Sequence, residues 1–165
     1  MSDASANDKL LPAVTLTAAG SGREFDLSRL GVPAILVFHG QDTADAALEV
    51  NKAVRREHPG AGEILFASVI DLRSFPAMFH GMVKPALEKA YFNAAGKVPE
   101  GADPADLVVL LPDWDGAVHE AVGVRDSTTE AAIVLVDSQA RIRRIEQGAP
   151  LADKAMAGLA DLLGS

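Results

Sequence analysis

The chain has 165 residues, of which 48% are hydrophobic and 23% are charged, a composition that suits one compact globular domain and excludes a disordered chain. Fifteen basic residues against 23 acidic ones give a formal net charge of −8, which repels phosphate backbones and argues against nucleic acid as a partner. The chain contains no cysteine, so disulfides, thiolate metal sites, iron–sulfur clusters and thiol catalysis are excluded.

The first nine residues are polar and predict a flexible tail. They lack the basic and apolar segments of a signal peptide. The apolar run from Val32 to Phe38 is too short to span a bilayer. We therefore predict a single domain over residues 1–165, in the cytoplasm and without a membrane partner.

Apolar runs separated by turn residues predict the strands. A short strand is expected over residues 13–17, before the Gly20-Ser21-Gly22 turn. Continuous apolar runs are typical of strands buried on both faces of a parallel sheet. Three such strands are predicted over residues 32–38, 64–70 and 107–111, and a hairpin over 132–136 and 141–145.

Helical spacing of apolar residues fills the gaps between these strands. One helix is predicted from Asp42 or Thr43 to about His58, a second from about Ser74 to Ala95 that Pro85 kinks or splits, and a third over residues 151–163. Residues 96–104 read as a loop and 117–124 as helical or irregular. The alternation predicts an α/β fold, with one mixed sheet covered by helices on both faces.

Three segments resemble the thioredoxin-like superfamily, and within it the peroxiredoxin and thiol-oxidoreductase branch. These segments read LPAVTLTAAGSGREFDLSRLGVPAILVFHG, LPDWDGAVHEAVGV and IVLVDSQARIRRIEQG. The resemblance extends over residues 11–163 and implies a thioredoxin-like fold. Residues 71–105 match least, and we interpret them as a helical insertion.

The resemblance also implies where a redox site would lie. The family places its reactive cysteines at the start of the helix after the first buried strand, and these positions fall here on Thr43 and Ala46. The position of the family's cis-proline falls on Glu130 or Ala131, and the peroxidatic arginine has no clear counterpart. Asp45 would in addition raise the pKa of a neighbouring thiol. The resemblance therefore implies the fold but not the activity.

The preferred hypothesis is a non-redox binding or assembly module without a cofactor. The aromatic and methionine residues concentrate in the Phe75–Phe92 region, where they are either ordinary core, a cap over the degenerate site, or a surface for a homodimer or protein partner.

The alternative hypothesis is a cysteine-free enzyme that uses the pocket at the helix start. His39 follows a buried strand at the sheet edge where α/β proteins bind ligands, and would act as a base. Asp42, Thr43, Asp45 and Asp71 are its candidate partners. The simpler interpretation makes His39 a hydrogen-bonded residue at a strand end and makes the first three of the others helix caps.

A metal site with nitrogen and oxygen ligands is the third hypothesis. The four histidines, with Asp71, Asp113 and Asp115, offer suitable ligands. No pair of histidines has ligand spacing, and we predict no metal; the four are His39, His58, His80 and His119.

Two further motifs favour structural roles. Asp113-Trp114-Asp115-Gly116 reads as a turn with Trp114 packed over the sheet edge rather than as a carboxylate pair. Ser74 and Ser127 do not lie in a nucleophile elbow, so the sequence predicts no Ser-His-Asp chemistry.

Overall fold

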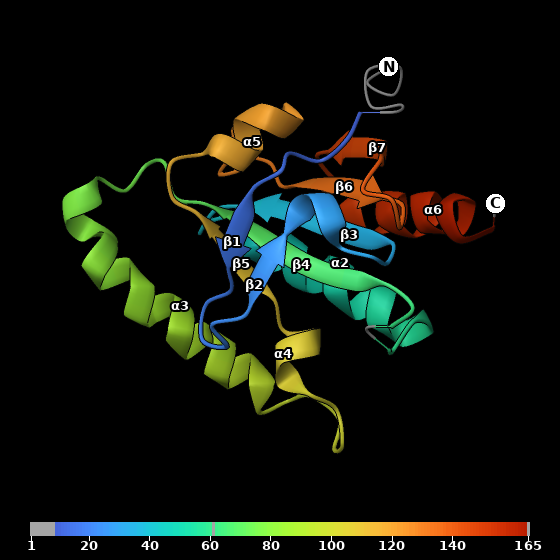
Figure 1. Ribbon diagram of the computed structural model, residues 1–165, viewed down its shortest axis with the longest axis horizontal. Helices are drawn as coiled ribbons and strands as arrows, with labels where there is room; N and C mark the ends of the chain where they lie inside the picture. Colours follow the sequence, from blue (N-terminus) through green and yellow to red (C-terminus); the bar gives the residue numbers. More distant parts are fainter. Residues whose placement is uncertain (1–8, 61, 165) are drawn as a thin grey trace.

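The computed structural model describes residues 9–60 and 62–164, which form one five-stranded sheet, a small hairpin and flanking helices (Figure 1). The sheet has the strand order β5-β4-β3-β6-β7, and β1 and β2 pair separately. The strands are β1 (Thr15–Thr17), β2 (Glu24–Asp26), β3 (Ala34–His39), β4 (Leu65–Asp71), β5 (Leu110–Asp113), β6 (Ala132–Val136) and β7 (Ile142–Gln147).

The central strand β3 fixes the register of the sheet. It runs parallel to β4, with Ala34 opposite Leu65 and His39 opposite Ile70, and antiparallel to β6. β4 and β5 are parallel, whereas β6 and β7 form an antiparallel hairpin. The mixed sheet, its buried strands and its terminal hairpin confirm the predicted arrangement. Strands covered on both faces carry mostly apolar side chains, which is why the apolar runs indicated them.

The helices alternate with the strands as predicted. They are η1 (Leu27–Arg29), α2 (Ala44–Glu57), η2 (Ala77–Phe79), α3 (His80–Ala95), α4 (Pro104–Leu107), α5 (Ala117–Val122) and α6 (Leu151–Gly164). Of these, η1 and α4 are two short helices that the sequence did not predict. The structure corrects the predicted strand over 107–111: α4 ends at Leu107, and the strand begins three residues later. Asp103 caps α4 by accepting a hydrogen bond from the Ala105 amide, which lets Pro104 open a helical turn there.

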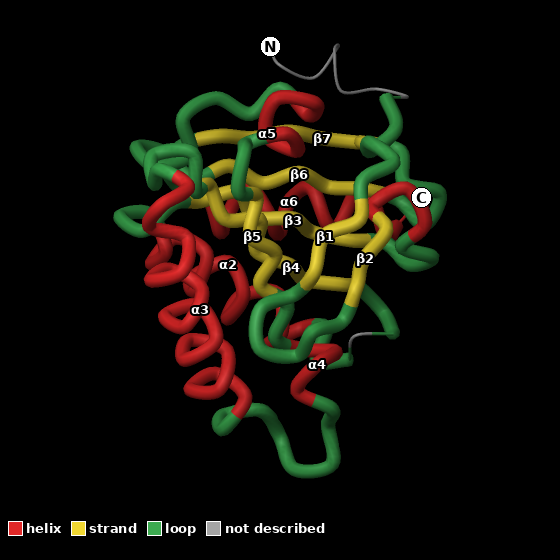
Figure 2. Tube along the Cα trace, turned by 60° about the vertical axis from the view of Figure 1, so that its left-hand side comes forward, coloured by secondary structure: helices red, strands yellow, loops and turns green. Residues whose placement is uncertain are grey.

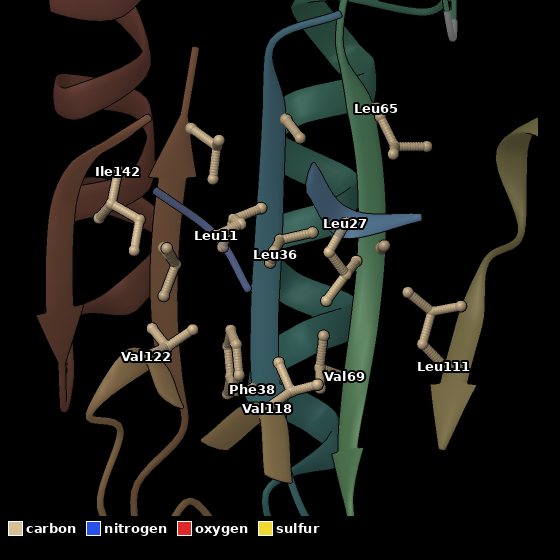
Figure 3. Packing of buried hydrophobic residues seen from close by; sticks show 14 of the residues in the cluster. Leu11, Leu27, Leu36, Phe38, Leu65, Val69, Leu111, Val118, Val122 and Ile142 are labelled. Carbon is tan, nitrogen blue, oxygen red and sulfur yellow. The ribbon is translucent and has the colours of Figure 1, made fainter. Parts of the chain in front are cut away.

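The two faces of the sheet carry separate apolar clusters. On one face, Ile35, Val37 and Phe66 pack against α2 and α6. On the other face, Leu36 and Phe38 pack with Leu27 of η1 and Val118 of α5 (Figure 3). Residues of β3 therefore alternate between two different environments.

Helix α3 lies beside the β5 edge of the sheet (Figures 1 and 2). Among its residues, Tyr91 is the buried one. The Tyr91 ring lies so close to Gly20 that a Cβ there would collide with it. The C-terminal half of α3 is therefore held against the turn between β1 and β2.

Pro85 does not split the predicted helix in two, since α3 continues through this residue. Pro85 is the sixth residue of the helix and is exposed. Its missing amide removes one hydrogen bond to the carbonyl of Gly81, which is also exposed, so water can satisfy that oxygen.

Of the predicted tail, residues 1–8 lie outside the described part of the chain. The Lys9 carbonyl oxygen accepts a hydrogen bond of 2.7 Å from the Ile142 amide, so the last residue of that segment is attached to β7. The segment interpreted as an insertion holds η2 and α3, together with the first residues of α4.

Candidate functional site

The residues predicted for the degenerate redox site surround one groove of about 490 Å³. Thr43 and Ala46 line it from the start of α2, and Glu130 and Ala131 line it from the segment before β6. Asp42, Asp45 and Glu49 lie in the same groove. With Glu130, the described residues that line the groove include four carboxylates and no basic side chain, which disfavours anionic ligands.

Thr43 occupies the N-cap position of α2, but its side chain does not cap the helix. Its hydroxyl accepts a hydrogen bond of 2.9 Å from the Gly40 amide and donates one of 2.6 Å to the Ser127 carbonyl oxygen. A Cβ at Gly40 would lie 2.6 Å from Cγ2 of Thr128. The start of α2 and the loop before β6 are therefore in direct contact, which corrects the expected capping role of Thr43.

His39 ends β3 and is 7% exposed. Its Nδ1 lies 2.8 Å from the Gly40 carbonyl oxygen. A carbonyl oxygen only accepts, so Nδ1 carries a hydrogen and the neutral ring leaves Nε2 as an acceptor. Burial lowers the pKa of His39, and the nearby His119 lowers it further, against the opposing hydrogen bond to Gly40.

The structure does not bring the proposed enzyme constellation together. Asp42, Thr43 and Asp45 lie in the acidic groove, whereas His39 lines a separate cavity. Asp71 follows Ile70, the partner of His39 in β4, so alternation directs it to the opposite face of the sheet.

Asp71 forms a bidentate pair with Arg73. The guanidinium Nε and one terminal nitrogen donate to the two carboxylate oxygens over 3.0 and 2.6 Å. Burial opposes ionisation of Asp71, but the hydrogen bonds from Arg73 outweigh it and lower the pKa of this carboxyl. Asp71 is thus an ionised, paired carboxylate.

The cavity that His39 lines has a volume of about 890 Å³ and lies between α2, α3 and the sheet face over β4. Phe66 and Ile70 of β4 form part of its floor, and Leu48 belongs to its α2 wall. Its α3 wall is a row of apolar side chains at helical spacing, among them Val83, Ala86, Leu87 and Ala90. These α3 residues face a cavity rather than packing on the sheet.

A buried polar network lies on the other face of the sheet. The Asp113 carboxylate accepts hydrogen bonds from the His119 amide over 2.9 Å and from His119 Nδ1 over 2.8 Å. In the neutral ring, Nε2 then accepts from the Ser127 hydroxyl, 2.8 Å away. Burial opposes the charge on Asp113, but the hydrogen bonds from the His119 ring and amide outweigh it and lower the pKa of this carboxyl.

This network has the order of partners found in Ser-His-Asp catalysis, which the sequence did not predict. His119 and Ser127 are both 0% exposed, and the His119 ring meets Phe38 edge-on at 4.8 Å between centroids. A nucleophile without access to a substrate does not react, so we assign the network a structural role. The sequence signal was limited to a histidine on an otherwise apolar helix face, six residues after an aspartate at a strand end.

The remaining predicted residues are dispersed. The Trp114 ring contacts that of His80, at the start of α3, with 4.3 Å between centroids and a tilt of 39°. His58 lies near Glu63 beyond the end of α2. Over residues 9–60 and 62–164, no group of three or more histidines and carboxylates is arranged to hold a metal ion. No helix within these ranges is both long and apolar enough to cross a membrane.

Comparison with known proteins relates the fold to solved structures. No family model matches the chain, and no curated protein matches it either. Peroxiredoxin Q of Xanthomonas campestris superposes with a TM-score of 0.62 at 18% identity, over 96% of this chain and 97% of its own.

Two further structures match to a similar extent. The exposed lipoprotein thioredoxin Etrx1 of Streptococcus pneumoniae gives a TM-score of 0.61 at 18% identity, over 90% of this chain and 98% of its own. A secreted Mycobacterium tuberculosis disulfide oxidoreductase homologous to E. coli DsbE gives 0.56 at 18% identity, over 91% and 96%. The chain thus has a thioredoxin-like α/β fold, as predicted, and it lacks the cysteines on which thiol redox activity depends.

Proposed function

We propose that this cysteine-free chain with a thioredoxin-like fold is a non-redox binding module that holds a small apolar molecule in the cavity beneath α3. The observation that carries the proposal is the cavity of about 890 Å³ between α2, α3 and β4. Ligand sites of small molecules are concave, mostly apolar and of about 300–1,000 Å³, with few polar groups to orient the ligand. The cavity has each of these properties.

The acidic groove and the buried Asp113 network are weaker candidates for a ligand site than the cavity. The groove at Thr43 and Ala46 is acidic and lacks a thiol, and its two walls are hydrogen-bonded to each other through Thr43 and Ser127. The network of Asp113 and His119 has no exposed reactive atom. The cavity is therefore the site at which binding a ligand buries the most apolar surface.

The test is titration with N-phenyl-1-naphthylamine, an uncharged apolar dye whose fluorescence rises in apolar surroundings. We expect saturable binding at one site per chain. Ala86→Trp fills the α3 wall of the cavity, and we expect it to reduce dye affinity at least tenfold. Ala160→Trp is the matched control, because Ala160 is exposed on α6 and does not line the cavity.

Circular dichroism and thermal unfolding establish that both variants are folded. Dye binding that is not saturable, or binding that Ala86→Trp leaves equal to the control, overturns the proposal.

A second candidate is assembly of a homodimer through the Phe75–Phe92 region. The specific observation is that Met78, Met82 and Phe92 are 80%, 72% and 63% exposed. Large exposed apolar side chains on η2 and the adjoining α3 favour an interface. Sedimentation equilibrium tests this candidate: a dimer that Phe92→Lys dissociates supports it, and a monomer at all concentrations removes it.

A further inference from the structure

Two polar atoms on the wall of the cavity make no hydrogen bond within the described chain. They are open to the cavity, since the fully enclosed unpaired side-chain atoms of the described residues belong to Arg55. Ser68 of β4 is 6% exposed, and its hydroxyl forms no hydrogen bond with residues 9–60 or 62–164. The same holds for Nε2 of His39, which is 7% exposed. A ligand that fills the cavity removes both atoms from water, so it must offer them hydrogen bonds in return.

The register of the sheet places these two residues together. Val37 pairs with Ser68 and His39 pairs with Ile70, so His39 and Ser68 lie on neighbouring strands, two positions apart, on the same face. Strand spacing and rise place their Cα atoms about 8 Å apart. One ligand group lying between their side chains is therefore within reach of both.

The chemistry of the two atoms defines that group. His39 Nε2 accepts, since Nδ1 is the donor to the Gly40 carbonyl oxygen. The Ser68 hydroxyl can donate or accept. A group that both donates and accepts satisfies the two atoms at once, whereas an ether or a carboxylate offers no hydrogen to Nε2.

The lining also excludes a charged head group. None of the described residues around the cavity is a lysine, arginine, aspartate or glutamate. Its other polar side chains, Gln41 and Asn51, are uncharged amides. An isolated charge in apolar surroundings costs several kcal/mol or more unless a counter-charge accompanies it.

Resting on the proposed function, we infer that the ligand is an uncharged amphiphile, an aliphatic chain with an alcohol-type head group. The aliphatic chain lies against β4 and the apolar row of α3. The hydroxyl donates to Nε2 of His39 and accepts from the Ser68 hydroxyl. This arrangement leaves neither atom unpaired when the ligand displaces water from the cavity.

The experiment compares three probes that share a ten-carbon chain: 1-decanol, decyl methyl ether and decanoate. Each displaces N-phenyl-1-naphthylamine at pH 8. We expect 1-decanol to bind roughly three- to tenfold more tightly than the ether, the effect of one or two net hydrogen bonds, and decanoate to bind most weakly. In Ser68→Ala and in His39→Phe, we expect the ether to bind at least as tightly as the alcohol.

The outcomes separate the two proposals. Equal affinity of wild-type protein for the alcohol and the ether, or a preference for decanoate, overturns the head-group inference while binding in the cavity stands. A wild-type protein that binds neither the dye nor any probe overturns the proposed function itself. The comparison of probes on wild-type protein decides the inference even if a variant does not fold.

Discussion

The Thr43 hydroxyl lies 2.6 Å from the carbonyl oxygen of Ser127, 84 residues further along the chain. These two residues belong to the helix start and to the loop before β6, the two segments that hold the cysteines and the cis-proline in the family that the sequence resembles. Where that family has a reactive thiol, this chain has a structural hydrogen bond.

We expect Thr43→Val to destabilise the protein by about 1–2 kcal/mol. The substitution keeps the shape of the side chain, but it leaves the Gly40 amide and the Ser127 carbonyl oxygen without their partner. Urea unfolding measures the loss. Thr17→Val, at an exposed position of β1, is the control, and an equal effect of the two substitutions would contradict the structural role of Thr43.

Ser127→Ala tests the buried network. Without the hydroxyl, Nε2 of His119 remains buried and unpaired, and we expect a loss of about 1–3 kcal/mol. Ser138→Ala, in the exposed turn between β6 and β7, is the matched control. A Ser127→Ala protein as stable as this control would show that the hydrogen bond contributes nothing.

Gly40→Ala tests the contact between the end of β3 and the loop before β6. The new Cβ would lie 3.1 Å from the backbone Cα of Thr128 as well as close to its side chain, so the loop must move. We expect a loss of about 1–3 kcal/mol. Gly62→Ala places its methyl group in open space, and thermal unfolding of both variants should separate them clearly.

The pH dependence of stability reports on His39. Burial lowers its pKa in the folded protein below the unfolded value of about 6.5, so the unfolded chain binds the proton more readily. The contribution of His39 is therefore fully present above pH 6.5 and declines as the pH falls toward the folded pKa, by at most about 1.4 kcal/mol per pH unit.

Urea unfolding between pH 8 and pH 5 measures this contribution. We expect His39→Phe to gain stability relative to wild type as the pH falls below 6.5. His58→Gln, which removes a histidine that does not line the cavity, is the control. A stability difference between His39→Phe and wild type that stays constant over this range would refute the assignment.

The strands β3 and β6 were predictable because each lies in a continuous apolar run closed by a turn residue, VPAILVF and AAIVLV respectively. The resemblance also indicated that Thr43 and Ala46 lie near Glu130 and Ala131, and the structure places all four in one groove. This proximity depends only on the order of strands and helices. The physical basis in both cases is local patterning carried by a regular topology.

The sites that depend on register and on long-range contact could not be predicted. The partners Asp113, His119 and Ser127 come from a strand, a helix and a loop without a shared motif. Likewise, only the register, in which His39 pairs with Ile70, shows that Asp71 lies on the opposite face and is not a partner of His39. An apolar row on α3 is the same sequence pattern whether the helix packs on a sheet or faces a cavity.

The attachment of α3 at Tyr91 has a consequence for its motion. A helix with one buried side chain loses little apolar burial when it separates from the sheet, so such openings need far less free energy than global unfolding. We expect amide hydrogens of residues 80–88 to exchange with solvent through local opening. Those of α2 and β3 should exchange only when the whole domain unfolds. We therefore expect local opening of α3 to widen access to the cavity that it lines.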